Sequence, residues 1–341
     1  MSSSTTETSS TAAVSTRPPA PDQTATRRGI TLQKFGRDYG IFFALVVVVI
    51  AATVVYPRFL HWDNLSAVLA QNAPLGIIAI GMTFVIISGG FDLSVGSVFA
   101  AAGTTAAMVA VATGSVALSF IAALAVGLLC GLVNAVVITI LRVNPFVATL
   151  GSMTFFSGLI LLITHNSPVT VSDSAFQWLG TGWLGPVPVS VVVMIALFAL
   201  GWIVISKSAY GRRVMSVGGA KEASRLAGIR VDLVKGSTYV ICGVLAAVAG
   251  FIAASQLGVG QGNAGVGLEL QAIAVVVIGG TSLLGGEGSM LRTALGLAIL
   301  ATLNNIFFSL AVDTNWQGIT QGLILVAAIA FDQYLRKVAP K

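Results

Sequence analysis

The stretch Tyr210–Lys235, YGRRVMSVGGAKEASRLAGIRVDLVK, is one long polar interruption of a sequence that is otherwise apolar from about residue 40 onward. Together with Lys207 it carries seven of the eighteen Lys and Arg residues of the chain. Lys and Arg are retained on the cytoplasmic side when a membrane protein inserts, so a loop this basic is expected in the cytoplasm. Residues 207–235 therefore predict a cytoplasmic loop that meets a soluble partner, on a protein that otherwise lies in lipid.

The composition supports a membrane protein. Hydrophobic residues make up 56% of the chain and charged residues 9%, with a mean hydropathy of +0.94, whereas a soluble domain carries roughly 25% charged residues. A bilayer core about 30 Å thick needs roughly 20 apolar residues per spanning helix. We expect an all-α, polytopic transmembrane helical bundle of about ten spans. The predicted spans are 40–56, 65–88, 94–112, 116–141, 145–164, 188–206, 236–255, 269–284, 290–311 and 318–334.

Ten spans place the two termini on one side of the membrane. With the N-terminus inside, every Lys and Arg residue except Arg58 falls on the cytoplasmic side, which is the asymmetry that sets topology. We therefore expect cytoplasmic N- and C-termini and a transmembrane domain over residues 39–335.

Residues 1–38 differ in composition from the remainder. Ser, Thr, Ala and Pro dominate the first 26 residues and apolar periodicity is absent, which predicts a disordered cytoplasmic tail. A signal peptide is the alternative, but the first apolar run begins only at Ile41, and Val54–Pro57 is a poor cleavage site. We therefore interpret Ile41–Tyr56 as an uncleaved first span.

Motifs for chemistry are missing from the sequence. It contains no Gly-x-x-x-x-Gly-Lys-Ser/Thr phosphate loop, no His-Glu-x-x-His and no Gly-x-Ser-x-Gly. Cys130 and Cys242 lie in predicted spans without metal or disulfide spacing, so we expect packing residues, and His61 and His165 are expected at the membrane interface. No metal site, cofactor or catalytic residue is predicted. If the chain moves a solute, the energy comes from another subunit or from an ion gradient.

Within the basic loop, Gly218-Gly219 predicts a flexible entry, Ala220–Ala227 a short helix, and Gly228 its end. Lys221 and Arg225 are four residues apart, which suits a helix lying along the membrane surface or in a groove of a partner. The alternative is an ordinary basic loop attracted to anionic headgroups. Physical reasoning alone leaves both open.

A second motif, GGFDLSVGS over residues 89–97, places a carboxylate and two hydroxyls among glycines between two spans. Non-helical backbone at membrane depth is tolerated only inside protein or along a water-filled cavity, and an ionisable residue there indicates function. The alternative is that Asp92 or Ser94 caps the following helix. The two roles are compatible.

A third motif, GGTSLLGGEGS over residues 279–289, resembles the second as a glycine-rich break after an apolar run. Such a pair hints at an internal repeat with broken helices, as in transporters built from duplicated halves. Packing of small residues between membrane helices is the alternative explanation.

Three segments in this order, GMTFVIISGGFDLSVGS from Gly81, YGRRVMSVGGAKEASRLAGI from Tyr210 and GGTSLLGGEGS from Gly279, resemble the permease subunit of bacterial ABC importers of the ribose, xylose and arabinose group. The resemblance covers about residues 40–335. It implies a multi-pass permease of the bacterial cytoplasmic (inner) membrane that imports a monosaccharide by alternating access. It also implies that the permease is not itself an enzyme.

The partners implied by the resemblance are a second copy of the permease, most simply in a homodimer, and a cytoplasmic ATPase subunit, in which two ATPase domains can be fused. The ATPase would hold ATP and Mg²⁺, and the permease no cofactor. An extracytoplasmic sugar-binding protein would deliver the solute. Membrane lipid is expected around the chain, and nucleic acid is not expected as a partner.

Under this resemblance the loop 207–235 couples the permease to the ATPase. The residues that match the coupling pattern are Gly211, Arg212, Arg213, Gly218, Gly219, Glu222, Ala223, Arg225, Gly228 and Ile229. The residues expected to shape the translocation path or gate are Gly89, Gly90, Asp92, Ser94, Gly96, Ser97, Gly279, Gly280, Ser282, Gly285 and Gly286. Two positions depart from the family pattern: Ala220 replaces the usual Asn, which puts a polar helix cap in doubt, and Arg292 replaces a frequent Gly.

Three tryptophans are candidates for docking the binding protein: Trp178 and Trp183 in the 165–187 loop, and Trp316 in the 313–318 turn. The alternative is anchoring of these rings among lipid headgroups.

The main rival function is a secondary transporter driven by protons or sodium, which requires an ion site in the bundle. Asp92 could serve such a site, but no clear second intramembrane carboxylate accompanies it. A membrane-embedded enzyme lacks a nucleophile, a base and an orienting group. An ABC permease for a nucleoside or a branched amino acid is the milder alternative.

Overall fold

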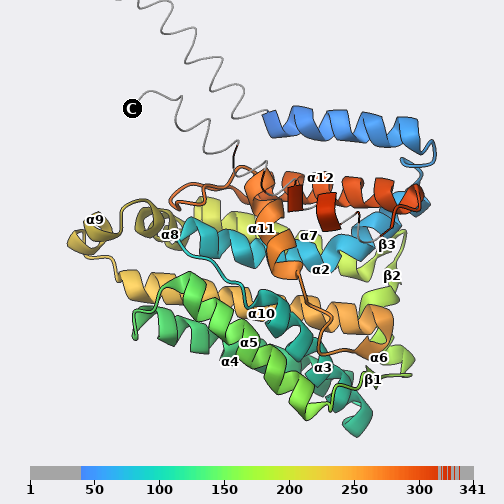
Figure 1. The fold of residues 1–341 in the computed structure, drawn as a ribbon, viewed down its shortest axis with the longest axis horizontal. Coiled ribbons are helices and arrows are strands. Elements are labelled where there is room, and N and C mark those ends of the chain that lie inside the picture. The colour runs from blue at the N-terminus through green and yellow to red at the C-terminus, as the bar shows by residue number, and fades with distance from the viewer. Residues whose placement is uncertain are drawn as a thin grey trace, which may run out of the picture. The chain divides into compact units, whose positions relative to one another are not determined.

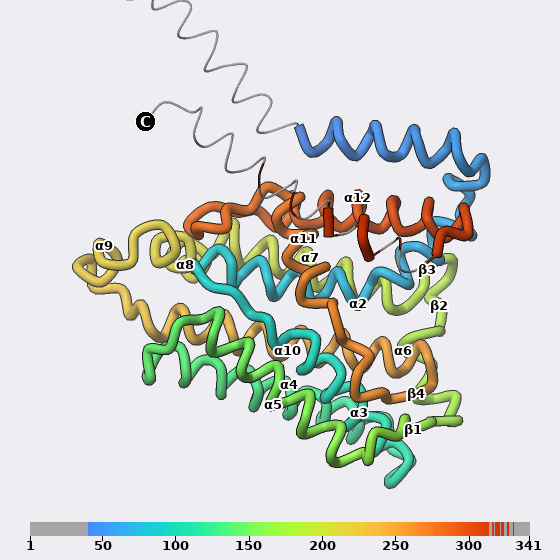
Figure 2. Tube along the Cα trace, viewed as in Figure 1, coloured from blue at the N-terminus to red at the C-terminus, as the bar shows by residue number. Residues whose placement is uncertain are grey.

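The computed structural model describes residues 40–313, 316, 318–320, 322–323, 326 and 330, and most of them are helical (Figures 1 and 2). Within this part of the chain, seven helices are long and apolar enough to cross a membrane. They are α2 (Trp62–Ile87), α3 (Val95–Thr113), α4 (Val116–Thr139), α5 (Pro145–Ile163), α7 (Val189–Lys207), α10 (Val231–Leu257) and α12 (Met290–Ser309). The predicted class, a polytopic helical bundle, agrees with this architecture.

The remaining elements are short. Two apolar helices, Gly40–Val55 and α11 (Leu268–Ile278), fall below the length of a full span. The other helices are α6 (Ser174–Thr181), α8 (Ala209–Gly219) and α9 (Lys221–Leu226). Strand β1 (Val169–Thr170) pairs antiparallel with β4 (Val259–Gly260), and β2 (Trp183–Leu184) pairs antiparallel with β3 (Val187–Pro188).

The eighth predicted span, 269–284, is longer than the helix that the structure contains. Helix α11 ends at Ile278 because Gly280 has a φ of 75°, in the left-handed region, and Gly285 and Gly286 do as well. Most of the tenth predicted span, 318–334, and the predicted tail 1–38 lie outside the described residues. The count of ten spans stays a prediction.

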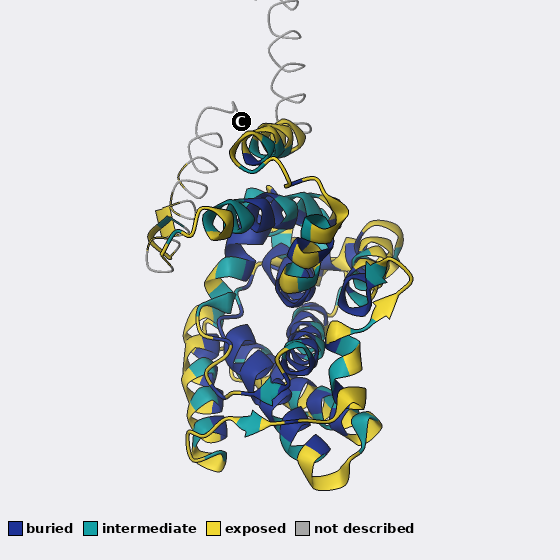
Figure 3. Ribbon diagram, turned by 90° about the vertical axis from the view of Figure 1, so that its right-hand side faces the viewer, coloured by how far each residue is buried: buried dark blue, intermediate teal, exposed yellow. Residues whose placement is uncertain are grey.

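Helices differ in how much of their surface the bundle covers. In the most apolar part of α2, 83% of residues are buried, against 22% in α5. Helix α10 packs mainly against α4, α3 and α2, and Figure 3 shows the buried residues on the sides of the helices that face one another. Because lipid tails are apolar, the poorly covered sides of α4, α5 and α7 are expected to face lipid. Helices α2, α3 and α10 form the centre.

Close helix contacts in this centre depend on glycine. A Cβ on Gly243 of α10 would overlap the carbonyl oxygen of Gly127 of α4, and a Cβ on Gly250 would overlap the carbonyl oxygen of Phe99 in α3. Small residues let helix backbones approach and pack without a hydrophobic driving force. The large glycine content is therefore partly a packing device, in agreement with the alternative explanation for the glycine-rich motifs.

A proline inside α2 is compensated by a neighbouring helix. Pro74 has no N–H, so it cannot bond the Ala70 carbonyl oxygen one turn earlier. Gln256 of α10 donates its Nε2 to that oxygen at 2.9 Å. In lipid every backbone group needs a partner, and this bond satisfies the carbonyl that proline leaves open.

Candidate functional site

The predicted break between the second and third spans is non-helical, as expected. Helix α2 ends at Ile87 and α3 begins at Val95. Figure 1 shows the intervening segment running from the α8 end of α2 toward the middle of the bundle, where α3 starts. Gly89 has a φ of 75°, and a Cβ on Gly90 would overlap the hydroxyl of Tyr239. Glycine is thus required at both positions, by conformation at one and by space at the other.

Asp92 lies within this break and is 1% exposed. Its Oδ1 accepts hydrogen bonds from the backbone N–H of Ser94 at 2.9 Å and from the Ser94 hydroxyl at 2.6 Å. The Asn134 Nδ2 of α4 donates to the same hydroxyl at 2.7 Å, and the Cys242 thiol of α10 is a further partner of the carboxyl group. Hydrogen bonds offset the cost of burying such a polar group. This network fixes the start of α3 against α4 and α10.

Ser94 is the N-cap residue of α3, but no side chain caps the helix there. Asp92 accepts from the N–H of Ser94 itself rather than from an amide of the first helical turn, so the predicted cap on the first amides of α3 is absent. The path or gate interpretation stays a prediction, because Asp92 faces none of the described cavities. Asn134 and Cys242 were missed as partners in the sequence. The only available signal was a single Asn inside an apolar run.

The basic loop 207–235 is largely helical, and one prediction for it is wrong. Gly218-Gly219 is not a flexible entry but the last turn of α8, which runs from Ala209 to Gly219. The reason is tertiary: the end of α8 packs directly on two other backbones, and only glycine permits that approach. The predicted short helix is present as α9, followed by Gly228 with a φ of 79°.

Helix α8 is amphipathic. Val214 and Val217 are buried against the bundle, whereas Arg212 and Arg213 are exposed. The Ser208 hydroxyl caps the helix by accepting from Gly211 N–H at 3.0 Å, a favourable N-cap interaction. The surface of α8 that faces away from the bundle is therefore positively charged.

Tyr210 ties α8 to the start of α10. Its hydroxyl and that of Ser237 are 2.7 Å apart. Burial raises the pKa of Tyr210, and the hydrogen bond with Ser237 opposes that rise, so the phenol stays protonated at neutral pH. Through this contact Tyr210 links α8 to the N-terminal part of α10, one of the central helices.

Three glycine motifs that are far apart in the sequence meet in one place. We call this contact the glycine junction, and its members are Gly89, Gly218, Gly219, Gly285 and Gly286. The Gly286 N–H donates to the Ile87 carbonyl oxygen at 2.8 Å. A Cβ on Gly218 would overlap that same oxygen, and one on Gly285 would lie 2.8 Å from the Gly89 Cα. The end of α8 is therefore in direct backbone contact with both predicted breaks.

Helix α9 projects from the junction with little cover. Ala220 occupies its N-cap position and makes no side-chain cap, as the departure from the family pattern implied. Leu226 is 90% exposed. Arg225 and Glu222 form an exposed ion pair at 3.6 Å, of a kind that contributes little to stability. The leucine and both charged side chains are therefore free to contact a partner.

The predicted coupling and path residues differ in placement. Gly211 and Gly218 are enclosed by other backbones. The predicted coupling residues that are exposed are Arg212, Arg213, Gly219, Glu222, Ala223, Arg225 and Gly228, and Ile229 is half-buried. Gly279 is packed against the Arg292 carbonyl of α12, and the Ser282 hydroxyl accepts from Leu284 N–H at 3.2 Å. Gly280 has a positive φ and open space around it. The structure brings most of these residues to one end of the bundle, which we call the α9 end.

At the opposite end, which we call the α6 end, Trp178 and Trp183 are 50% and 53% exposed. Helix α6 is held there by Ser255 of α10, whose hydroxyl accepts from Gly180 N–H at 2.7 Å and donates to the Phe176 carbonyl at 2.6 Å. Trp316, beyond the end of α12, is 63% exposed. The exposure of the rings fits both docking and lipid anchoring, so the docking role stays a prediction.

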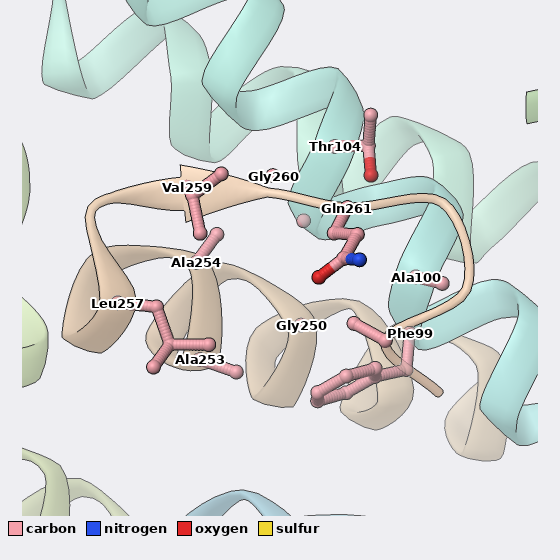
Figure 4. A pocket seen from close by; sticks show the side chains of 12 residues that line it. Phe99, Ala100, Thr104, Gly250, Ala253, Ala254, Leu257, Val259, Gly260 and Gln261 are labelled. Carbon is pink, nitrogen blue, oxygen red and sulfur yellow. The ribbon is translucent and has the colours of Figure 1, made fainter. Parts of the chain in front are cut away.

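Two small cavities adjoin each other along α3. One, of about 20 Å³, lies between α3, the end of α10 and the segment after β4, as Figure 4 shows, and is lined by Thr104 and Gln261 among others. The other, of about 110 Å³, lies beside Ser97 and the start of α11. Ala100 lines both. Of the predicted path residues, Gly96 and Ser97 line the larger cavity.

The proteins that this chain resembles are permeases. Residues 64–329 match the family model described as branched-chain amino acid transport system / permease component. The chain is 37% identical to the ribose import permease protein RbsC of Haemophilus influenzae, over 86% of this chain and 92% of that protein. It is 38% identical to RbsC of Bacillus subtilis, over 89% of this chain and 93% of that protein.

A third relative is the L-arabinose transport system permease protein AraH of Escherichia coli, 37% identical over 89% of this chain and 93% of that protein. No solved structure matches. The order of the three motifs, the seven helices long and apolar enough to span a membrane, and these relatives all indicate the same family of membrane permeases. The chain is a multi-pass inner-membrane protein, and it belongs to the family of branched-chain amino acid transport system permease components.

Proposed function

We propose that this chain is the permease subunit of an ATP-driven importer and that it carries a monosaccharide delivered by an extracytoplasmic binding protein. The names of its relatives support a sugar, since they import ribose or transport L-arabinose. A secondary transporter is not favoured, because these relatives are import permeases of one family and the basic surface of α8 and α9 would have no use. Nucleoside and branched amino acid import are the alternatives to test.

The glycine junction is the observation that carries the proposal. A soluble ATPase cannot act on a membrane path unless its movement reaches that path. Here the polar surface of α8 and α9 continues through Gly218 into direct contact with the break before α3 and the break after α11. Lys235 adds a further link, because its Nζ donates to the Gly89 carbonyl at 3.0 Å. Closely packed backbone of this kind transmits displacement.

In this proposal α8 and α9 contact the ATPase, and ATP and Mg²⁺ are held by that partner. The permease acts with a second copy of itself, has ten spans, and has both termini in the cytoplasm. The binding protein docks at the α6 end, where Trp178 and Trp183 are exposed. Alternating access then follows from movement of α8 relative to the breaks.

The decisive test is ATP hydrolysis by the co-purified permease and ATPase in nanodiscs. We compare wild type with Arg225→Glu, Glu222→Lys and the double variant. The double variant keeps the ion pair of α9 but reverses its direction on the surface. If α9 contacts the ATPase, the double variant loses ATPase stimulation or detaches, whereas a role within α9 alone would be rescued by the swap.

The matched control is Arg142→Glu, which removes an exposed cation between α4 and α5, outside the α8–α9 surface. It is expected to keep both binding and stimulation. Uptake of ribose, arabinose, a nucleoside and leucine into cells with the binding protein identifies the solute. Uptake that collapses when the proton or sodium gradient is dissipated, with no ATPase bound by wild type, contradicts the proposal.

A further inference from the structure

The larger of the two cavities along α3 lies at the middle of the membrane. It is lined by Thr154 and Ser157, and Thr154 is the midpoint of α5, a helix of 19 residues. At 1.5 Å per residue such a helix is about 28 Å long, close to the thickness of the bilayer core. A residue at its midpoint is therefore near the bilayer centre.

The non-helical segment 261–267 reaches the depth of this cavity. After β4, which pairs with β1 near the α6 end, residues 261–267 pass alongside α5, where a Cβ on Gly262 would meet the Leu161 side chain, and reach α3. At Gly265 and Gly96 the two backbones are so close that a Cβ on either would overlap the other backbone. Only then does α11 begin, at Leu268. Within the segment, the Ala264 N–H donates to the Gln261 carbonyl at 3.1 Å and the Val266 N–H to the Asn263 carbonyl at 3.3 Å, so it is a series of turns rather than an α-helix.

Parts of the same segment are open to the outside of the subunit. Gln261, Asn263 and Val266 are all exposed, Val266 by 78%. Lipid-exposed irregular backbone does not occur in the hydrocarbon region, where it must be buried in protein or line water. Lipid is therefore excluded as the neighbour of this face.

The side chains around the cavity favour water over a covering protein surface. Within the part of the chain that the structure describes, the Asn263 carboxamide and the Ser157 hydroxyl make no hydrogen bond. Glu269, at the start of α11, adds a half-buried carboxylate held by backbone of Gly267 and of Glu269 itself. Leaving such groups unpaired under a dry surface costs about 1–3 kcal/mol each. Water or a hydroxylated solute satisfies them.

The adjoining smaller cavity extends the polar lining along α3. The Thr104 hydroxyl there is buried and has no hydrogen-bond partner among the described residues. Gln261, on the opposite wall, has its side chain beside this cavity (Figure 4). The volume of about 20 Å³ is enough for a single water molecule. Thr104 and Gln261 thus add two polar side chains along α3, in a lining otherwise formed by apolar residues and glycine.

We propose that the solute path on this subunit runs along the segment 261–269 and past Ser157, and that Asn263, Ser157 and Glu269 are positioning residues for the hydroxyl groups of the passing sugar. These three residues lie outside the motif-based set of path residues. Their chemistry fits a polyol, because amide, hydroxyl and carboxylate groups exchange hydrogen bonds with sugar hydroxyls, while Ala100 and Met153 line the same cavity with apolar surface. The sugar as solute rests on the proposed function, but the aqueous path does not.

Cysteine accessibility tests the aqueous path directly. We label the variants Asn263→Cys and Ser157→Cys in membranes of the assembled transporter with a membrane-impermeant, cationic thiosulfonate. The control is Phe155→Cys, at a similar depth on α5 but on its lipid side, where Phe155 is 64% exposed. Reactivity follows access of the thiolate to water, so the two path variants should react at least about tenfold faster than the control. Native Cys130 and Cys242 are buried, and wild type measures their background.

Transport by Asn263→Ala and Glu269→Gln provides the second readout. Because the binding protein sets the apparent affinity, a positioning role lowers the maximal uptake rate by roughly tenfold, the equivalent of one hydrogen bond to a charged or polar group. KM and stimulated ATP hydrolysis stay unchanged, so more ATP is consumed per sugar. A purely structural role would instead lower protein yield, uptake and hydrolysis together.

The outcomes separate the two proposals. If wild type imports sugar while the thiols introduced at positions 263 and 157 are as unreactive as the one introduced at position 155, the path inference is wrong and the proposed function stands. If both path variants react but wild type imports none of the tested sugars, the aqueous path stands and the proposed solute class is wrong. Protection of the thiol in Asn263→Cys by the transported sugar supports both.

Discussion

Gly218 shows how much one residue without a side chain can decide. It belongs to a glycine pair that looks like a flexible hinge in the sequence, yet it lies in the last turn of α8. Its Cα faces the Ile87 carbonyl oxygen and the Gly286 amide so closely that no Cβ fits. Its lack of a side chain therefore serves packing rather than flexibility.

Gly218→Ala should loosen the glycine junction. Overpacking a closely packed site costs about 1–3 kcal/mol, so we expect a lower melting temperature in detergent and weaker coupling of ATP hydrolysis to uptake. The control is Gly151→Ala in α5, where an added Cβ meets nothing within 4 Å. Equal melting temperatures for the two variants would contradict the close contact.

Pro74 and Gln256 are a second pair whose meaning is visible only together. Gln256→Ala leaves the Ala70 carbonyl oxygen without its donor, at a cost of about 0.6–1.7 kcal/mol for a hydrogen bond in a membrane bundle. Pro74→Ala restores the N–H of α2 that can reach this carbonyl. In the Pro74→Ala background, Gln256→Ala should therefore cost less. The four proteins of this double-mutant cycle are compared by thermal unfolding, and additive effects would contradict the coupling.

Among the secondary-structure elements, the helices divide by their surroundings. In the most apolar parts of α2, α3 and α10 at least 67% of the residues are buried, whereas in those of α4, α5 and α7 at most 33% are. Helix α8 follows α7 as an amphipathic helix with a charged outer surface. The charged surface of α8 therefore lies at one end of the central helices.

The docking of α6 on α10 depends on one hydroxyl. Ser255→Ala removes the acceptor of Gly180 N–H and the donor to the Phe176 carbonyl in a buried site, and unpaired buried groups cost about 1–3 kcal/mol. We expect faster proteolysis of the 165–187 loop and weaker binding of the loaded binding protein. Thr181→Ala is the matched control, because its hydroxyl donates to the Gln177 carbonyl within α6. If both variants are cleaved at the wild-type rate, Ser255 does not hold α6.

Across the whole molecule, the distribution of basic residues predicts which end faces the cytoplasm. The α9 end carries the basic loop, and the α6 end carries the exposed Trp178 and Trp183. The variants Ser9→Cys, Arg142→Cys and Asn166→Cys test this orientation with an impermeant thiol reagent. In intact cells only Asn166→Cys should be labelled, and the other two variants should react only after permeabilisation. Labelling of Ser9→Cys in intact cells would mean an odd number of spans before the basic loop or a reversed tail.

The positions of most helices could be predicted from the sequence. Long apolar runs need burial in lipid wherever they occur, so spans such as 116–141 and 145–164 agree with α4 and α5 within two residues. The predicted span 269–284 was too long for α11, because it included Gly279-Gly280 of the glycine-rich motif, where the left-handed conformation of Gly280 ends the helix.

The site was predicted in part. The three motifs were identified because they carry polar or glycine residues where apolar residues are expected, and they meet at the glycine junction. Three residues were missed as hydrogen-bonding partners, since a single such residue in an apolar run has no local pattern; they are Asn134, Cys242 and Gln256. Their importance follows from what lies opposite them in space.

Hydropathy, charge and motif order are read locally along the chain, so they were enough to establish a membrane bundle, the course of its helices, the basic loop and the family. The tertiary structure was needed to show that Gly218 packs as helix, that Asp92 is enclosed by Ser94, Asn134 and Cys242, and that Ser157 and Asn263, far apart in the sequence, line one cavity. These are contacts between residues far apart in sequence, and their energies depend on which backbones approach each other.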